Sequence, residues 1–252
     1  MSRYLLGFVL LYFLYKPSMA SELKIAVASN FSSAAKEIGS SYTQKNKIDI
    51  VFSFGSSGKI YSQIRNGAPY DIFLSADQVR PEKLIQEGKA LAQTRMTYAT
   101  GQLVLWSPQE NLIKSIIDGE GKISDAQKIK AIKHLAIANH KLAPYGLAAV
   151  QVMEKMKLQD IFKGKIVLGE NISQAYQFVA SGNAEVGFVA LSQVISQYGE
   201  NNYWRIPLDY YNPIKQDGVI LSRSQKLQES KDFLQFLTSE EAKKIIIKHG
   251  YR

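Results

Sequence analysis

The chain has 252 residues, 46% of them hydrophobic, and this length and composition suffice for one large domain or two lobes with full cores and exclude a disordered chain. The absence of cysteine excludes disulfide bonds, thiolate metal sites and a lipid-attachment cysteine. The formal net charge of +9 comes without an aromatic-interleaved basic cluster, so it favours small anions or an acidic surface over nucleic acid.

Residues 1–20 have the features of a secretory signal peptide. Arg3 precedes an apolar run over residues 5–15, and Ser-Met-Ala at 18–20 places small residues before a cleavage position. The run is shorter than the ~20 residues that a membrane-spanning helix needs. We therefore expect a periplasmic mature protein that begins near Ser21, with an uncleaved N-terminal anchor as the alternative.

Two strand-to-helix junctions of similar composition follow. Residues 23–28 alternate like a strand and end in Ser29-Asn30, after which apolar residues recur at helical spacing. Residues 48–54 form a β-branched and aromatic run that ends in the Gly-Ser-Ser-Gly turn at 55–58, and a helix pattern resumes from Lys59. The simplest function of these serines is helix capping. However, the unpaired N–H groups of a helix start also bind anions without a cation, and parallel sheets gather such turns at one edge.

The Gly-Ser-Ser-Gly turn matches neither of two enzyme motifs. A P-loop has four residues between its glycines and a Ser or Thr after the lysine, whereas only two residues separate Gly55 from Gly58 and Ile60 follows Lys59. A nucleophile elbow has the pattern Gly-x-Ser-x-Gly, and this turn is one residue short of it. Neither phosphate transfer nor serine hydrolysis is therefore indicated.

The rest of the chain continues to alternate strands and helices, which predicts an α/β fold with mostly parallel sheets. Asp71 and Asp77 flank a predicted strand and are expected to cap and brace loops rather than act as an acid/base pair. The further expected elements are a strand over 96–106, a loop with a short helix over 107–130, strands at 135–138, 165–168, 185–192 and 218–221, a helix from 147, and one long helix from 230 to a stop at 250.

Seven segments resemble the periplasmic molybdate-binding proteins of ABC transporters, which are type II periplasmic binding proteins. They follow the family's order, cover essentially the whole mature chain, and are most specific at 67–77. The segments are Ala-Ser-Asn-Phe at 28–31, Phe-Gly-Ser-Ser-Gly at 54–58, Gly-Ala-Pro-Tyr-Asp-Ile-Phe-Leu-Ser-Ala-Asp at 67–77, Pro-Tyr-Gly at 144–146, Glu-Asn-Ile at 170–172, Gly-Phe-Val at 187–189 and Pro-Ile-Lys-Gln-Asp at 213–217.

This resemblance implies a two-lobed periplasmic-binding-protein fold with the ligand in the cleft between the lobes, each lobe being a mostly parallel sheet flanked by helices. We place one lobe at 22–102 and 212–252 and the other at 103–211, with the two crossovers as the hinge. The implied function is capture of molybdate, and of tungstate, for delivery to the membrane permease of an ABC importer. We expect a monomer that is not an enzyme, has no cofactor and binds no nucleic acid.

The resemblance also implies which residues contact the ion. They are Ser29, Asn30, Ser57, Tyr145 and Ile172, the last through its backbone N–H, with no direct metal ligand. Some members of the family have a tyrosine where this chain has Ala190, so that contact is absent. A phenol can donate to an oxyanion, and we therefore expect the Tyr145 hydroxyl to compensate.

Chemistry distinguishes the candidate ligands. Molybdate is a fully deprotonated dianion at neutral pH and needs only donors, whereas phosphate retains a proton and needs an acceptor as well. Sulfate is a smaller dianion, so a protein for another tetrahedral oxyanion such as sulfate is the alternative. An enzyme with Ser57 as nucleophile or His140 as base is disfavoured, because the histidines lack a recognisable pairing. An interaction module would show no effect of small anions on its melting temperature.

Overall fold

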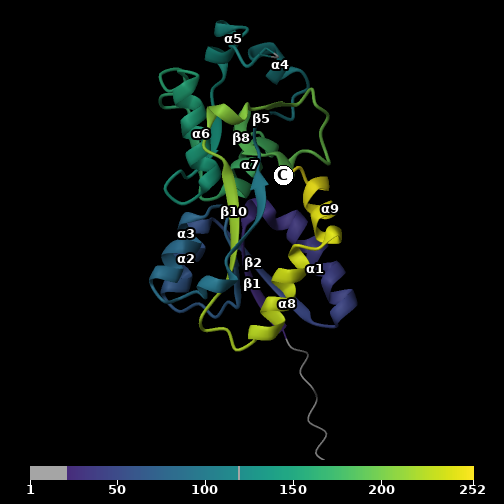
Figure 1. Cartoon of the computed structure of the whole chain (residues 1–252). Helices are drawn as coiled ribbons and strands as arrows, with labels where there is room; N and C mark the ends of the chain where they lie inside the picture. The colour runs from purple at the N-terminus through teal and green to yellow at the C-terminus, as the bar shows by residue number, and fades with distance from the viewer. Residues whose placement is uncertain (1–21, 119) are drawn as a thin grey trace, which may run out of the picture.

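The computed structural model describes residues 22–118 and 120–252, so the expected signal peptide at 1–20 lies outside the described residues. Two five-stranded sheets form the centres of two lobes, which lie end to end in Figure 1. The first sheet has the order β2 (Asp49–Gly55), β1 (Glu22–Ala28), β3 (Ile72–Leu74), β10 (Ile214–Ile220) and β4 (Met96–Gly101). The second has the order β7 (Ile166–Gly169), β6 (Leu135–Ala138), β8 (Val186–Ala190), β5 (Leu103–Trp106) and β9 (Tyr203–Arg205).

Helices cover both faces of the first sheet because its strands alternate apolar side chains between the two faces. Leu23, Ile25 and Val27 of β1 face a core built with α1 (Ser32–Asn46), α8 (Leu227–Leu237) and α9 (Glu240–Lys248). Ala26, from the same strand, faces the other core, which contains Ile60 of α2 (Ser57–Arg65) and residues of α3 (Val79–Gln86). This sheet and its helices are called lobe 1.

Lobe 2 is built around the second sheet. Its helices are α4 (Leu112–Ile116), α5 (Ala126–Ala131), α6 (Pro144–Lys155) and α7 (Ile172–Ala180). Trp106 is fully buried there, stacked on Tyr176 with ring centroids 4.9 Å apart. In the described part of the chain, four 3-10 helices lie between the other elements, namely η1 (Ser29–Phe31), η2 (Ala92–Thr94), η3 (Leu191–Gln193) and η4 (Leu208–Tyr210).

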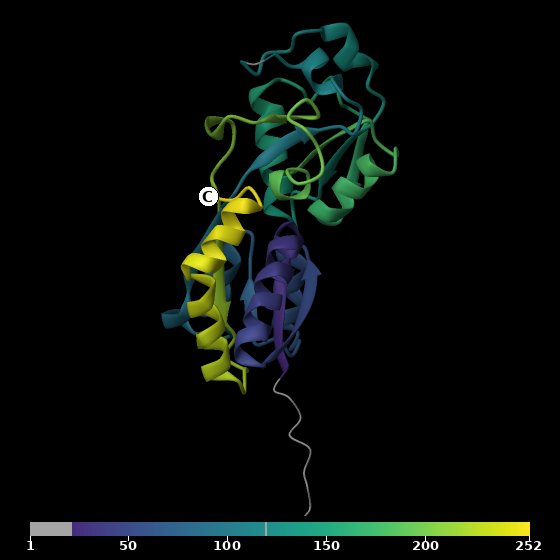
Figure 2. The ribbon, with the colours of Figure 1, turned by 90° about the vertical axis from the view of Figure 1, so that its right-hand side faces the viewer.

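The predicted α/β fold class is confirmed, but each sheet is mixed rather than mostly parallel. β1 pairs in parallel with β2 and β3, and β6 pairs in parallel with β7 and β8. The antiparallel pairs all involve β10 or β5. These two strands directly follow the crossovers between the lobes, so each enters its sheet from the side where the lobes meet (Figure 2).

Two elements that the sequence predicts as continuous are each divided in two in the structure, so these two predictions are wrong. The single strand expected over 96–106 is β4 and β5, which belong to different sheets and are separated by Gln102. The single last helix is α8 and α9, separated at Thr238 and Ser239, because the Ser239 hydroxyl accepts the Ala242 N–H and starts a new helix. The polar segment 107–130 contains two short helices, and the short strand β9 was not predicted.

The chain crosses between the lobes at Gln102 and again between β9 and β10. The C-terminus reinforces this region, because Thr100 and Arg252 exchange both backbone hydrogen bonds. The Gln102 side chain also donates to the Gly250 carbonyl, with 2.7 Å between Nε2 and O. Within residues 22–118 and 120–252, no helix combines the length and apolar character that a membrane crossing requires.

Candidate binding site

One small cavity between the lobes is lined by all five residues that the sequence singles out. Ser29, Asn30 and Ser57 come from lobe 1, and Tyr145 and Ile172 come from lobe 2. All five are at least 95% buried. The cavity is small, with a volume of about 10 Å³.

The start of α2 leaves one backbone donor for this cavity. Ser56 is the N-cap, and its hydroxyl and carbonyl accept the N–H groups of Lys59 and Ile60. The Gly58 N–H donates across the cleft to the Leu142 carbonyl at 2.8 Å. Among the first four N–H groups of the helix, only that of Ser57 therefore has no acceptor on the described chain. The Ser57 hydroxyl accepts from the Ala76 N–H at 2.9 Å, which leaves its own proton available to donate.

The start of α7 repeats this arrangement in lobe 2. The Asn171 side-chain oxygen accepts the N–H groups of Ser173 and Gln174 at 2.9 and 3.1 Å, and its carbonyl accepts that of Ala175. The Ile172 N–H is left without an acceptor among the described residues. Asn171 is thus the cap that orients this donor, as expected for an asparagine at this position.

The start of α6 also leaves a single donor. Pro144 occupies the first helical position and has no N–H. Gly146 and Leu147 donate their N–H groups to the Ala143 carbonyl. The backbone N–H of Tyr145 is therefore the remaining donor at this start within the described chain, and Tyr145 lines the cavity.

Asn30 lies in a buried polar cluster behind the cavity. Its amide nitrogen donates to Gln216 Oε1 at 3.0 Å and to the Tyr251 hydroxyl at 3.1 Å, so both amide protons are used. The Tyr251 hydroxyl donates to the Asn30 carbonyl at 2.6 Å, and Ser192 of lobe 2 donates to the same carbonyl at 2.9 Å. Asn30 consequently joins the two lobes, and its backbone N–H is its remaining donor.

The tyrosines of this cluster stay protonated. Burial raises the pKa of Tyr145 and of Tyr98 well above the ordinary value for a phenol, and it also raises the pKa of Tyr251. The Tyr145 hydroxyl lies 3.5 Å from the Asn30 amide nitrogen and packs directly against Gly101. Gln216 is fully buried, and its Nε2 has no partner within the described chain. These groups therefore present neutral dipoles and no ionic charge.

Among the described residues that line the cavity, the Tyr145 phenol is the only ionisable side chain. Sequence reasoning missed part of this wall and the cluster behind it. Gln216 lies in the family-like segment at 213–217, but the sequence indicated no function for it. Nothing in the sequence pointed to Tyr251. The wall residues that were missed are small or apolar, namely Ala28, Gly55, Ser56, Ala76, Ala143 and Pro144.

Several contacts join the lobes around the cavity. Ser29 Oγ donates to Asn171 Oδ1 and Ser173 Oγ donates to the Ser29 carbonyl, both at 3.3 Å. At the rim, Lys59 forms an exposed ion pair with Glu170 at 2.6 Å. Together with the Gly58 contact, these bonds hold the cleft closed.

The other chemical groups named from the sequence lie outside the cavity. Asp71 accepts hydrogen bonds from the Lys24 N–H and the Ser224 hydroxyl, and Asp77 accepts from the Arg80 N–H, so both brace loops as predicted. His140 is exposed beside the cleft. Within the described residues, no group of three or more His, Cys, Asp or Glu side chains could hold a metal ion.

Comparisons with known proteins identify relatives that cover nearly the whole chain. The chain is 45% identical to the molybdate-binding protein ModA of Rhodobacter capsulatus over 235 residues, which cover 93% of this chain and 90% of that protein. It is 44% identical to ModA of Azotobacter vinelandii over 236 residues, with 93% and 91% covered. The solved periplasmic molybdate-binding protein of A. vinelandii superposes with a TM-score of 0.83 at 37% identity, covering 91% of this chain and 98% of that one.

All three of these relatives are named as molybdate-binding proteins. The family model for bacterial extracellular solute-binding proteins matches residues 23–252, which is nearly the entire described chain. The chain belongs to the family of bacterial extracellular solute-binding proteins.

Proposed function

We propose that this protein captures molybdate outside the cytoplasm and delivers it to an ABC importer. The observation that carries the proposal is the convergence of three helix starts on one uncharged cavity. Each of the helices α2, α6 and α7 leaves one backbone N–H without an acceptor among the described residues, and all three residues concerned line that cavity. Backbone N–H groups at helix starts, backed by the helix dipoles, are suited to a small anion.

The donor set suits a fully deprotonated dianion. Hydrogen bonds to a charged group contribute ~1.5–3 kcal/mol each, so several of them hold a buried ion without a lysine or arginine. Phosphate, which keeps a proton at neutral pH, would place that proton against donors only. Tungstate has the same charge and shape as molybdate and is expected to bind as well. Sulfate remains the alternative, although relatives 44–45% identical to this chain are molybdate-binding proteins.

Each predicted residue has a distinct role in this proposal. Ser57 donates through both its N–H and its hydroxyl, and the Ser29 hydroxyl would exchange its bond to Asn171 Oδ1 for one to the ion. Tyr145 and Ile172 donate through their backbone N–H groups. Asn30 also uses its backbone N–H, because its amide protons are already bound to Gln216 and Tyr251.

The backbone role of Tyr145 replaces the expectation that its hydroxyl compensates for Ala190. Ala190 does not line the cavity, and its N–H donates to Gln193 Oε1 at 2.9 Å. The Tyr145 hydroxyl is close to Asn30 and Gly101, in the cluster behind the cavity.

The proposal includes the setting in which the protein works. We propose that residues 1–20 are a signal peptide, that the mature protein is a periplasmic monomer, and that its partner is the membrane permease of the same transport system. The lobes would be 22–102 with 212–252, and 103–211, hinged at the two crossovers. No enzymatic step and no cofactor are part of this function.

A panel of oxyanions tests the proposal. The chain from residue 21 onward is heated with molybdate, tungstate, sulfate and phosphate in turn, and the affinities are then measured by calorimetry. Molybdate and tungstate are expected to raise the melting temperature strongly, sulfate weakly and phosphate not at all. A larger shift with sulfate would favour the alternative ligand, and no shift with any anion would contradict the proposed function.

A further inference from the structure

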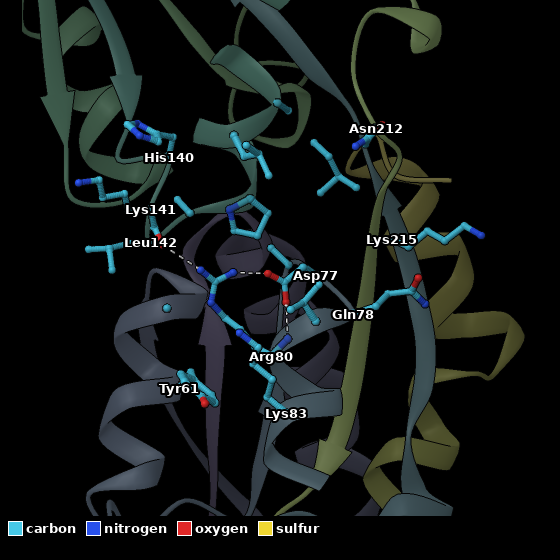
Figure 3. Close-up of a pocket in the computed structure, with 18 of the residues that line it drawn as sticks. Tyr61, Asp77, Gln78, Arg80, Lys83, His140, Lys141, Leu142, Asn212 and Lys215 are labelled. Atoms are coloured by element: carbon cyan, nitrogen blue, oxygen red, sulfur yellow. Dashed lines mark hydrogen bonds and ion pairs between the residues drawn. The ribbon is translucent and has the colours of Figure 1, made fainter. Parts of the chain in front are cut away.

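A second and larger hollow lies beside the buried cavity, on the line where the two lobes meet. It has a volume of about 600 Å³ and is bordered by α3, by the loop before α6 and by the start of β10 (Figure 3). Ala76, Ala143 and Pro144 line both hollows, so the two share a wall. We call this hollow the cationic groove, after the charged residues that line it: Asp77, Arg80, Lys83, Lys141 and Lys215, with His140.

The groove carries an excess of positive charge. Its one carboxylate, Asp77, is ion-paired with Arg80. Lys83, Lys141 and Lys215 are exposed and have no ion-pair partner within the described residues. The net contribution of these side chains is thus positive even with His140 neutral. The described residues that line the buried cavity, in contrast, include no charged side chain that could attract an anion from a distance.

Two contacts between the lobes lie where the groove meets the cavity. The Arg80 guanidinium donates to the Lys141 carbonyl at 3.2 Å, which Figure 3 draws as a dashed line. The Gly58 N–H donates to the adjacent Leu142 carbonyl at 2.8 Å. Gly58 lines the groove and directly follows Ser57, which lines the cavity. Both contacts therefore lie close to the wall that the two hollows share.

We propose that the cationic groove is the mouth through which the oxyanion approaches, and that its lysines form an encounter site for dianions. The inference rests on the proposed function and assigns different steps of binding to the cavity and to the groove. The neutral donors of the cavity set how slowly the ion leaves, while the lysines set how fast it arrives. A cleft lined by charge of one sign raises association rates by about 10- to 1000-fold, and salt weakens the effect.

Stopped-flow fluorescence with molybdate measures the association rate and so tests the role of the groove lysines. The triple variant Lys83→Gln, Lys141→Gln and Lys215→Gln is compared with the parent and with a control triple variant. The control, Lys133→Gln, Lys163→Gln and Lys231→Gln, removes the same charge from exposed lysines that do not line the groove. At ~0.01 M ionic strength, where the Debye length is about 30 Å, the groove variant should associate about tenfold more slowly than the parent.

The dissociation rate of the groove variant should equal that of the parent, because none of these lysines lines the ion cavity. Calorimetry should therefore show a dissociation constant raised by the same factor as the association rate falls. At ~0.15 M ionic strength, where the Debye length is about 8 Å, the difference should become much smaller. The control variant should associate nearly as fast as the parent at both ionic strengths.

The outcomes separate the two proposals. If the parent binds molybdate and both triple variants associate equally fast, or slow equally, the groove has no special role and the inference is wrong. A groove variant that changes only the dissociation rate would also overturn it. If the parent binds no molybdate, the proposed function itself fails and the groove proposal fails with it.

Discussion

Ser57 combines two free donors and one structural bond within a single buried residue. Its hydroxyl accepts from the Ala76 N–H, which fixes the oxygen and points the proton elsewhere. Its backbone N–H is the one left over at the start of α2 among the described residues. Lys59, two residues later, is exposed and paired with Glu170. Substitutions at Ser57 and at Lys59 can therefore distinguish binding by neutral donors from binding by a cation.

Ser57→Ala should weaken molybdate binding by ~1–3 kcal/mol, because the buried anion loses a hydroxyl donor. The free energy of unfolding should also fall by ~1–3 kcal/mol, because the Ala76 N–H loses its acceptor. Calorimetry and denaturant titration measure the two effects separately. The matched change Lys59→Ala should alter affinity by less than ~1 kcal/mol, since an exposed ion pair contributes little. The reverse ranking of the two variants would contradict binding by neutral donors.

Tyr145→Phe removes a hydroxyl but keeps the backbone N–H that we assign to the ion. We expect the dissociation constant to change by less than about fivefold, which corresponds to ~1 kcal/mol. If the hydroxyl donated to the ion directly, the loss would be ~1–3 kcal/mol, and tyrosine introduced at 190 would partly restore it. A large loss of molybdate affinity in calorimetry would therefore support the hypothesis that the Tyr145 hydroxyl compensates for Ala190.

At the scale of single residues, the sequence was informative where a residue type and a helix start coincide. Ser29, Asn30, Ser57, Tyr145 and Ile172 do converge on one cavity. The atoms that face an ion could not be predicted, because they depend on which donors are already used by long-range partners. Asn30 shows this, since its amide protons are bound by Gln216 and by Tyr251, 186 and 221 residues further along the chain.

At the scale of elements, the site depends on helix starts being both capped and in contact across the cleft. Alternating patterns in the sequence found nearly all strands, because most of them have one or two buried faces. They missed the break at Gln102, since the runs on both sides are apolar and nothing local indicates a change of sheet. They also missed the break before α9, where only the capping of Ser239 ends an otherwise continuous helical pattern.

Asn171→Asp should keep the cap of α7 but add a negative charge next to the cavity. Aspartate caps helices as well as asparagine does, so the free energy of unfolding should change little. Molybdate binding should weaken more than tenfold, because two like charges in a poorly solvated site repel strongly. Ser239→Asp, at the cap of α9 in lobe 1, is the control and should leave affinity unchanged in the same calorimetric titration. Equal effects of the two variants would mean that the Asn171 side chain is remote from the ion.

Gly58→Ala tests the contact between α2 and the loop before α6. A Cβ at this position would lie 2.9 Å from the Leu142 carbonyl oxygen and 3.0 Å from Leu142 Cα. Alanine suits a helix better than glycine, so lobe 1 itself should not be destabilised. Molybdate should bind at least tenfold more weakly, because the added methyl group obstructs closure. Gly199→Ala, where a Cβ would meet nothing within 4 Å, is the control. Unchanged affinity in Gly58→Ala would show that this contact is not needed for binding.

At the scale of the whole molecule, the proposed binding residues are shared between two lobes that are built on separate sheets. Lobe 1 provides Ser29, Asn30 and Ser57, and lobe 2 provides Tyr145 and Ile172, so a complete set of donors exists only when the cleft is closed. The buried cluster of Asn30, Ser192 and Tyr251 lies at the junction, near the crossover at Gln102. Binding and closure must therefore be coupled thermodynamically.

Saturating molybdate should consequently both compact and stabilise the protein. An ion that binds only the folded, closed form stabilises it by ~4 kcal/mol at a thousand times its dissociation constant. For a chain of this size, that corresponds to a rise in melting temperature of roughly 8–16 °C. Solution scattering should show a smaller radius of gyration with molybdate than without, and Gly58→Ala should reduce that difference. Stabilisation without compaction would mean that the cleft is already closed in the free protein, so that the ion enters without hinge motion and the proposed crossovers are not a hinge.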